Sequence, residues 1–228
     1  MDFSKISVVG LGYIGLPTAA MFASRGIDVV GVDVNPDVVA TINSGGIHII
    51  EPDLDAVVYK SVNEGKLRAT LTPEASQAFL IAVPTPISHD TLDPNLDYIQ
   101  AATNSIAPVI EKGNLVVLES TVPVGTTEKL CQWLSLKRSD LTFPDTHGEA
   151  SDIRIAHCPE RVLPGKVMQE LIENDRLIGG ISERCANLAK ELYTVFVRGE
   201  CVITSSPRTA ELAKLTENSF RDVNIAFA

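Results

Sequence analysis

Short apolar runs rich in β-branched residues alternate with longer amphipathic stretches along the whole chain. The short runs predict strands at residues 6–9, 28–32, 67–71, 78–83, 115–118, 153–156, 177–178 and 201–204. The longer stretches predict helices that begin after residue 15 and that span residues 36–43, 54–64, 97–112, 125–134, 183–196 and 207–228. This alternation predicts an α/β fold in which helices cover a doubly wound, mostly parallel sheet.

Prolines and polar residues mark three places that interrupt this pattern. Pro108 lies near the end of the helix predicted at 97–112, where a proline favours a break. Residues 87–94 and residues 138–152 are polar, and we expect loops and turns in both.

The most informative motif follows the first predicted strand, where Gly10, Gly12 and Gly15 are spaced as G-x-G-x-x-G ahead of a helix rich in small residues. Gly10 suits a tight turn, Gly12 lets the backbone approach a pyrophosphate, and Gly15 lets the helix pack closely against the strand. The pyrophosphate would bind at the helix N-terminus, where free N–H groups and the helix dipole favour an anion.

An acid follows at the expected distance, because Asp33 comes directly after the second predicted strand, 21 residues after Gly12. A carboxylate at this position accepts hydrogen bonds from ribose hydroxyls and repels a 2′-phosphate. The sequence therefore predicts a Rossmann-like domain that binds NAD rather than NADP. A glycine-rich turn without a ligand is the alternative.

Composition narrows the range of partners. A net charge of −10 argues against a nucleic acid. No apolar run approaches the length of a membrane span, and the first strand begins too close to Met1 for a signal peptide. The four cysteines form no C-x-x-C pair, so we expect neither a metal site nor a disulfide framework. Free thiols fit a cytoplasmic protein.

Two loops after predicted strands offer hydroxyl groups at the edge of the sheet where ligands bind. Val83-Pro84-Thr85-Pro86 presents Thr85 to a cofactor, unless it is only a rigid turn. The segment ESTVPVGTT presents Thr121 and Thr127 near a helix start, where they suit the nicotinamide end of NAD or a bound water. An ordinary helix cap would need only one of these hydroxyls.

Charged side chains occur in the loop CPERVLPG and in the last predicted helix. Glu160 is a candidate general base, and Arg161 is a candidate ligand for a polar substrate. Lys214 and Asn218 are four residues apart and share a helix face, which Arg221 nearly continues. A lysine beside an amide can steer or protonate an oxygen. A surface ion pair and a solvated helix face are the alternatives.

Taken together, the segments GLGYIGLP, VPTP, ESTVPVGTT, CPERVLPG and AELAKLTENSFRDVNIAFA resemble the UDP-glucose/GDP-mannose dehydrogenase family from end to end. The resemblance implies that two NAD oxidise the C6 alcohol of a UDP-sugar to a carboxylate, in the synthesis of a bacterial surface polysaccharide. It favours UDP-N-acetyl-D-mannosamine as the sugar nucleotide, with UDP-glucose and UDP-N-acetylglucosamine as the alternatives. It also implies the following cofactor-binding residues: Gly10, Gly12, Tyr13, Ile14, Gly15, Asp33, Thr85, Thr121 and Thr127.

The same resemblance assigns the substrate-binding and catalytic roles. Lys214 and Asn218 would bind near C6 and stabilise oxyanions, and Glu160 would assist thioester hydrolysis. Thr121 would also serve catalysis. Arg161, Val162 and Arg221 would contact the substrate, together with Lys214 and Asn218.

One departure from the family is large, because the family needs a nucleophilic cysteine in a G-G-x-C motif and this chain has none. A thiolate must capture the aldehyde product before a second hydride can leave. We therefore expect residues 1–205 to form the NAD-binding domain and residues 206–228 to begin a central dimerisation helix. The UDP-sugar domain would lie outside the chain, which would bind NAD without turnover. Homodimers would form in the full-length protein.

Two other classes of protein remain open. β-Hydroxyacid dehydrogenases share the glycine turn and a Lys/Asn helix and need no cysteine, although the PERVLPG and STVPVG segments speak against them. An NAD-sensing regulatory module would need only the glycine turn and Asp33, which would leave the other polar loops without a role.

Overall fold

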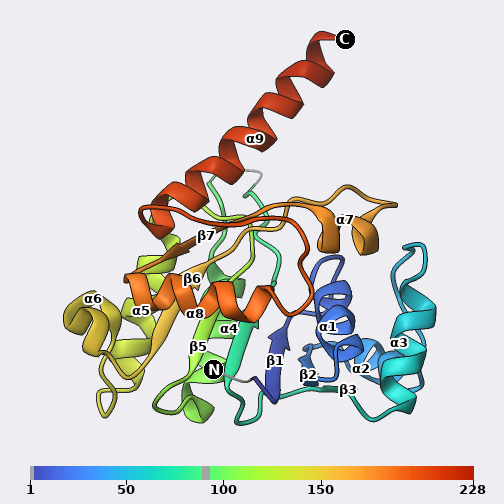
Figure 1. Cartoon of the computed structure of the whole chain (residues 1–228), viewed down its shortest axis with the longest axis horizontal. Helices are drawn as coiled ribbons and strands as arrows, with labels where there is room; N and C mark the ends of the chain where they lie inside the picture. Colours follow the sequence, from blue (N-terminus) through green and yellow to red (C-terminus); the bar gives the residue numbers. More distant parts are fainter. Residues whose placement is uncertain (1–2, 89–92) are drawn as a thin grey trace.

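The computed structural model describes residues 3–88 and 93–228, and within these ranges it contains one eight-stranded sheet with helices on both faces (Figure 1). The strands are β1 (Lys5–Val9), β2 (Asp28–Val32), β3 (Leu67–Thr70), β4 (Ala78–Ile81), β5 (Leu115–Leu118), β6 (Arg154–His157), β7 (Arg176–Gly180) and β8 (Cys201–Ile203). The α-helices are α1 (Gly15–Ser24), α2 (Pro36–Asn43), α3 (Leu54–Asn63), α4 (Asp97–Ile106), α5 (Thr126–Lys137), α6 (Pro144–His147), α7 (Val167–Glu173), α8 (Glu183–Tyr193) and α9 (Pro207–Phe227). The 3₁₀ helices are η1 (Ala107–Val109) and η2 (Gly148–Ala150).

The strand order is β3-β2-β1-β4-β5-β6-β7-β8. Neighbouring strands are parallel except β6 and β7, which pair antiparallel. The chain turns outward from β1 in both directions, so a crevice opens where the carboxyl ends of β1 and β4 meet. The predicted doubly wound, mostly parallel α/β fold is confirmed.

Side chains of alternate direction along the strands build a core on each face of the sheet. On β1, Ile6 and Val8 pack with α1, α3 and α8, whereas Val9 packs on the other face with α4 and α5. Most strand residues are buried, and β4, β5 and β6 are buried throughout, which explains the continuous apolar runs in the sequence.

The structure differs from the predicted elements mainly at their ends. The helix predicted at 97–112 ends at Ile106 and continues as η1, because Pro108 lacks the N–H that a further helical turn would need. The strand predicted at 177–178 extends over Arg176–Gly180. Neither α6 nor α7 was predicted, since helices of four and seven residues are too short to show a period. Residues 89–92 of the expected loop at 87–94 lie outside the described residues.

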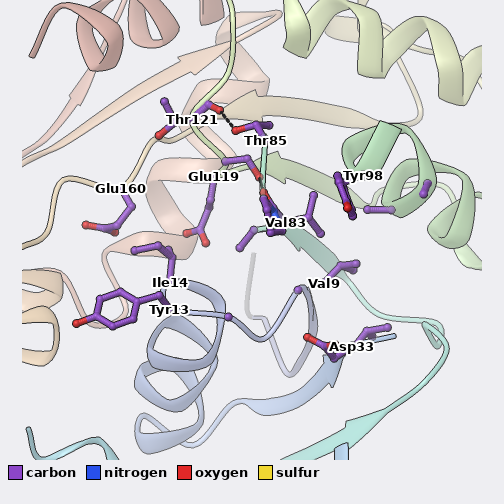
Figure 2. Close-up of a pocket in the computed structure, with 18 of the residues that line it drawn as sticks. Val9, Tyr13, Ile14, Asp33, Val83, Thr85, Tyr98, Glu119, Thr121 and Glu160 are labelled. Carbon is purple, nitrogen blue, oxygen red and sulfur yellow. Dashed lines mark hydrogen bonds between the residues drawn. The ribbon is translucent and has the colours of Figure 1, made fainter. Parts of the chain in front are cut away.

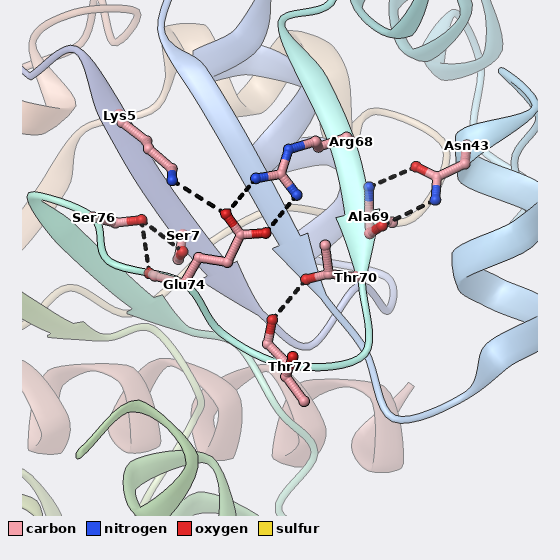
Figure 3. Close-up of polar contacts among 9 residues, drawn as sticks. All are labelled: Lys5, Ser7, Asn43, Arg68, Ala69, Thr70, Thr72, Glu74 and Ser76. Carbon is pink, nitrogen blue, oxygen red and sulfur yellow. Dashed lines mark hydrogen bonds and ion pairs between the residues drawn. The ribbon is translucent and has the colours of Figure 1, made fainter. Parts of the chain in front are cut away.

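A polar cluster ties the strands together at their amino ends, away from the crevice (Figure 3). The Glu74 carboxylate accepts hydrogen bonds from both terminal nitrogens of Arg68 on β3 and from Nζ of Lys5 on β1. The Arg68 hydrogen bonds, helped by Lys5, lower the pKa of Glu74 to about 2. All three groups are partly exposed, so we assign this cluster to the alignment of the strands.

The last helix, α9, begins with a cap in which the Ser206 hydroxyl accepts a hydrogen bond from N of Thr209. Its second half extends away from the rest of the molecule (Figure 1). Exposed apolar side chains along this half include Phe220, Val223 and Ile225. Within the described ranges, no helix is both long and apolar enough to cross a membrane.

Candidate functional site

A cavity of about 660 Å³ opens at the carboxyl ends of β1, β4 and β5 (Figure 2). Its wall includes the glycine turn after β1, the end of β2, the loops after β4, β5 and β6, and part of α9. This volume lies in the range that is typical of small-molecule sites. The topology therefore gathers the segments that the sequence marked separately.

The three glycines of the turn serve different purposes. Gly10 has a φ of +91°, and a Cβ there would lie 2.8 Å from the carbonyl oxygen of Ala82. A Cβ on Gly15 would overlap the carbonyl oxygen of Gly10. A Cβ on Gly12 would meet no atom within 4 Å. Gly10 and Gly15 are thus required by the fold, whereas Gly12 leaves free space on the cavity wall.

Asp33 is fixed at the cavity wall by the backbone. Its Oδ2 accepts a hydrogen bond from N of Leu11 at 3.0 Å, and its Oδ1 accepts one from N of Asn35 at 3.0 Å. Figure 2 shows this carboxylate far from Glu160, which lies across the cavity. Further wall residues were not predicted and carry no local motif: Val34, Leu71, Pro73, Tyr98, Ala101 and Ser105.

The loops after β4 and β5 are tied together at the cavity. The Thr85 hydroxyl donates to the carbonyl oxygen of Thr121 at 2.6 Å (Figure 2), and the Ser120 hydroxyl donates to the carbonyl oxygen of Val83 at 2.7 Å. Thr85 and Thr121 line the wall, as do Tyr13 and Ile14 of the glycine turn.

Thr127 lies outside this lining and has a partner within the chain. Its N–H and its hydroxyl both donate to Oε1 of Glu211, at 2.8 and 2.6 Å. The other oxygen of Glu211 accepts from N of Gly125 at 2.6 Å. A carboxylate from α9 thus satisfies the free N–H groups at the start of α5.

Glu119 is a wall residue that the sequence analysis did not select. Its Oε1 accepts a hydrogen bond from the Tyr193 hydroxyl at 2.6 Å, whereas Oε2 is buried and has no hydrogen-bond partner among the described residues. Burial raises the pKa of Glu119 to about 7. The sequence feature that could have identified Glu119 is its position directly after the entirely apolar strand β5.

Glu160 lines the cavity beside Glu119 and is also buried. Its Oε1 accepts from N of Arg161 at 2.6 Å. Its Oε2 lies 2.5 Å from Nη1 of Arg176, an ion pair whose angles fall outside hydrogen-bond geometry. The Arg176 guanidinium itself stacks over the Tyr193 ring at 5.1 Å. One buried cation therefore faces two buried carboxylates.

The predicted substrate residues divide into two groups. Val162, Lys214, Asn218 and Arg221 line the cavity, and Nη2 of Arg221 donates to Oδ1 of Asn218 at 3.2 Å. Burial lowers the pKa of Lys214.

Arg161 forms the second group, because it lies outside the lining and pairs with Glu217 of α9. Its Nε and Nη2 donate to the Glu217 carboxylate, with a shortest distance of 2.7 Å. This guanidinium is therefore already engaged within the folded chain. Gly15, inside α1, also lies outside the lining.

The cavity fits an extended dinucleotide. Free space over Gly12 and the adjacent start of α1 suit a diphosphate, and the Asp33 carboxylate suits ribose hydroxyls. The opposite end offers two carboxylates, a lysine and an amide, a set that can bind and exchange protons with an alcohol.

Comparisons with known proteins agree with this geometry. Residues 4–197 match the NAD binding domain of the UDP-glucose/GDP-mannose dehydrogenase family. The chain is 62% identical over 227 residues to the UDP-N-acetyl-D-mannosamine dehydrogenase of Campylobacter jejuni, and this match covers 100% of the chain and 56% of that protein. It is also 62% identical over 228 residues to the NDP-N-acetyl-D-galactosaminuronic acid dehydrogenase of Ralstonia nicotianae, and this match covers 100% of the chain and 53% of that protein.

A solved structure gives the same answer at the level of the fold. The UDP-D-ManNAc dehydrogenase of Pyrococcus horikoshii superposes with a TM-score of 0.90 at 48% identity, over 98% of this chain and 52% of that one. The chain thus spans about half the length of the relatives that it matches.

Proposed function

The chain belongs to the UDP-glucose/GDP-mannose dehydrogenase family and matches its NAD binding domain, and we propose that it is the cofactor-binding part of a UDP-sugar 6-dehydrogenase. One observation carries the proposal: a single cavity joins the glycine turn and Asp33 to Glu160, Lys214 and Asn218. A regulatory module that only sensed NAD would not need this second, reactive end.

The cofactor half of the cavity supports NAD rather than NADP. Asp33 would hold the adenosine ribose, the backbone after Gly10 would hold the diphosphate, and Thr85 and Thr121 would lie along the nicotinamide half. NAD, when bound, accepts the hydride that leaves the C6 carbon of the sugar. Thr121 would also hold a water or substrate hydroxyl at the reactive end.

The reactive half supports proton transfer at an alcohol. Lys214 and Asn218 would hold the C6 oxygen, and a lysine whose pKa is lowered by burial gives up a proton more readily than an exposed one. Glu160 would act as general base in the final hydrolysis, with Arg176 keeping its carboxylate in place. Val162 and Arg221 would contact the sugar nucleotide, whereas Arg161 would first have to leave Glu217.

UDP-N-acetyl-D-mannosamine is the substrate that we propose, because the relative from Campylobacter jejuni is named for it. Its product would be the corresponding uronate, a building block of a bacterial surface polysaccharide. The relative from Ralstonia nicotianae, an NDP-N-acetyl-D-galactosaminuronic acid dehydrogenase, is equally similar in sequence, so the nucleotide sugar with the corresponding C6 alcohol is the second candidate. Competition between the two nucleotide sugars for binding distinguishes them.

Three further parts of the proposal concern the whole enzyme. Residues 1–205 would form the NAD-binding domain and residues 206–228 would begin the central helix, with no turnover by this chain alone. Two copies would associate through the exposed apolar face of α9. The four free cysteines, all buried, are compatible with a cytoplasmic location.

Calorimetric titration with NAD tests the cofactor proposal. We expect the Asp33→Asn variant to bind NAD about tenfold or more weakly, because hydrogen bonds to a charged acceptor contribute about 1.5–3 kcal/mol. The loss for NADP should be smaller, since the variant no longer repels a 2′-phosphate.

Asp28→Asn is the matched control, because Asp28 starts the same strand but pairs with Lys66 at 2.7 Å on the surface. It should bind NAD like the wild type. An Asp33→Asn variant with unchanged NAD affinity would refute the assignment of Asp33.

A further inference from the structure

Glu51 lies in the loop between α2 and α3, yet its side chain is only 5% exposed. Its Oε2 accepts hydrogen bonds from the Tyr13 hydroxyl at 2.6 Å and from N of Gly165 at 2.9 Å. Its Oε1 accepts one from N of Val167 at 2.7 Å. One buried carboxylate therefore joins three segments that are far apart in the sequence.

These hydrogen bonds keep the Glu51 carboxylate ionised. Burial alone would raise the pKa of Glu51, but the hydrogen bonds from Tyr13, Gly165 and Val167 outweigh it and the pKa is lowered. The hydrogen bond to Glu51 raises the pKa of Tyr13, so its hydroxyl remains the donor. Hydrogen bonds to an ionised acceptor are about twice as strong as those between neutral groups.

Glu51 joins the glycine turn to the loop that carries Glu160, and each of these two segments contributes residues to the cavity wall. Tyr13 follows Gly12 in the glycine turn and lines the cavity, and Figure 2 shows its ring on the same side as Glu160. Gly165 and Val167 close the loop that leaves β6 and carries Glu160 on the cavity wall. Neither Gly165 nor Val167 lines the cavity itself.

We propose that Glu51 is a positioning residue that couples the cofactor turn to the substrate loop of residues 158–167. This inference rests on the proposed function, which assigns the turn to NAD and the loop to the sugar nucleotide. A dinucleotide over the turn restricts Tyr13, Tyr13 holds Glu51, and Glu51 holds the N–H groups of Gly165 and Val167. Because coupling is reciprocal, an ordered loop also strengthens cofactor binding.

Hydrogen exchange of the peptide 163–168, measured by mass spectrometry with and without saturating NAD, tests the coupling. In the wild type we expect NAD to slow exchange about fivefold, the lower end of typical coupling between two sites. In Glu51→Gln and in Tyr13→Phe the ratio of the two rates should be close to one. Tyr13→Phe leaves both backbone hydrogen bonds of Glu51 in place, so it separates coupling from the stability of the loop.

Glu170→Gln is the matched control. Glu170 accepts a hydrogen bond from N of Leu163 at 2.8 Å in the same loop, and among the described residues it makes no hydrogen bond or ion pair to the glycine turn. This variant should exchange faster in both states and keep the slowing by NAD. A purely structural role of Glu51 would give this same pattern in Glu51→Gln.

Calorimetry on the same samples separates the two proposals. If the wild type binds NAD but its exchange does not change, the coupling is refuted and the proposed function stands. If NAD slows hydrogen exchange of the peptide in Tyr13→Phe as much as in the wild type, the coupling is also refuted. This variant decides the question if Glu51→Gln does not fold. A wild type that fails to bind NAD refutes the proposed function and the coupling together.

Discussion

At the scale of single residues, the reactive end of the cavity is organised by an imbalance of buried charge. Glu119 and Glu160 face one buried guanidinium, that of Arg176, and the ion pair joins Arg176 to Glu160. Among the described residues, the neutral Tyr193 hydroxyl is the one hydrogen-bond partner of Glu119. Its pKa of about 7, raised by burial, means that it exchanges a proton near neutral pH.

This raised pKa predicts a pH dependence of stability. Because the pKa of Glu119 is higher in the folded state than the ordinary 4.5, its contribution is fully present below pH 4.5 and is lost as the pH rises through about 7. Between pH 5 and 8, the free energy of unfolding of the wild type should fall by about 2–3 kcal/mol relative to Glu119→Gln. Denaturant unfolding at both pH values measures this difference.

The exposed residue Glu183 on α8 provides a control for the charge change. Glu183→Gln should keep the pH dependence of the wild type. Parallel pH profiles for the wild type and Glu119→Gln would show that Glu119 does not retain a proton in the folded protein.

At the scale of elements, different glycines of the turn between β1 and α1 serve the fold and the ligand: Gly15 is needed for packing, and Gly12 leaves space for the cofactor. Gly15→Ala places a methyl group against the carbonyl oxygen of Gly10, so we expect a loss of about 1–3 kcal/mol in the free energy of unfolding. Gly12→Ala meets no neighbour and should unfold like the wild type, while NAD affinity falls about tenfold. Thermal unfolding and calorimetry of both variants measure the two effects.

The two variants test different claims: Gly12→Ala tests where NAD binds, and Gly15→Ala tests how tightly α1 packs. Gly12→Ala with wild-type affinity for NAD would show that the diphosphate does not lie over this glycine. A stable Gly15→Ala variant would show that the close packing of α1 against the turn can relax.

The elements that the sequence predicted well have local causes. Apolar β-branched runs identify the strands because a parallel sheet is buried on both faces. Asn35 and Ser206 mark the starts of α2 and α9 as caps. The short helix α7 could not be found this way, because its N-terminal N–H of Val167 bonds to Glu51, 116 residues away.

At the scale of the whole molecule, topology decides which motifs meet. The glycine turn, Thr85, Thr121 and Glu160 share one wall because each follows a strand whose carboxyl end lies at the same edge of the sheet, and α9 brings Lys214 to that wall. The order of strands and helices in the sequence predicted that the site lies at this edge. Most of the candidate residues do lie together there.

Long-range partners decide what the sequence could not reveal. Thr127 donates a hydrogen bond to Glu211, and Arg161 pairs with Glu217. Both acids lie on α9, and no local sequence pattern connects them with their partners. Glu119, in the loop after β5, has one oxygen held by the hydroxyl of Tyr193 on α8. Such contacts depend on how α8 and α9 pack, so they become visible only in the folded molecule.

A crystal structure of this chain grown with saturating NAD tests the central claim most directly, because it shows where each part of the cofactor binds. We predict the adenosine ribose within hydrogen-bond distance of Asp33, the diphosphate over Gly12, and the nicotinamide ring at the end that holds Glu119 and Glu160. An empty cavity, or a dinucleotide whose adenosine ribose lies away from Asp33, would contradict the account.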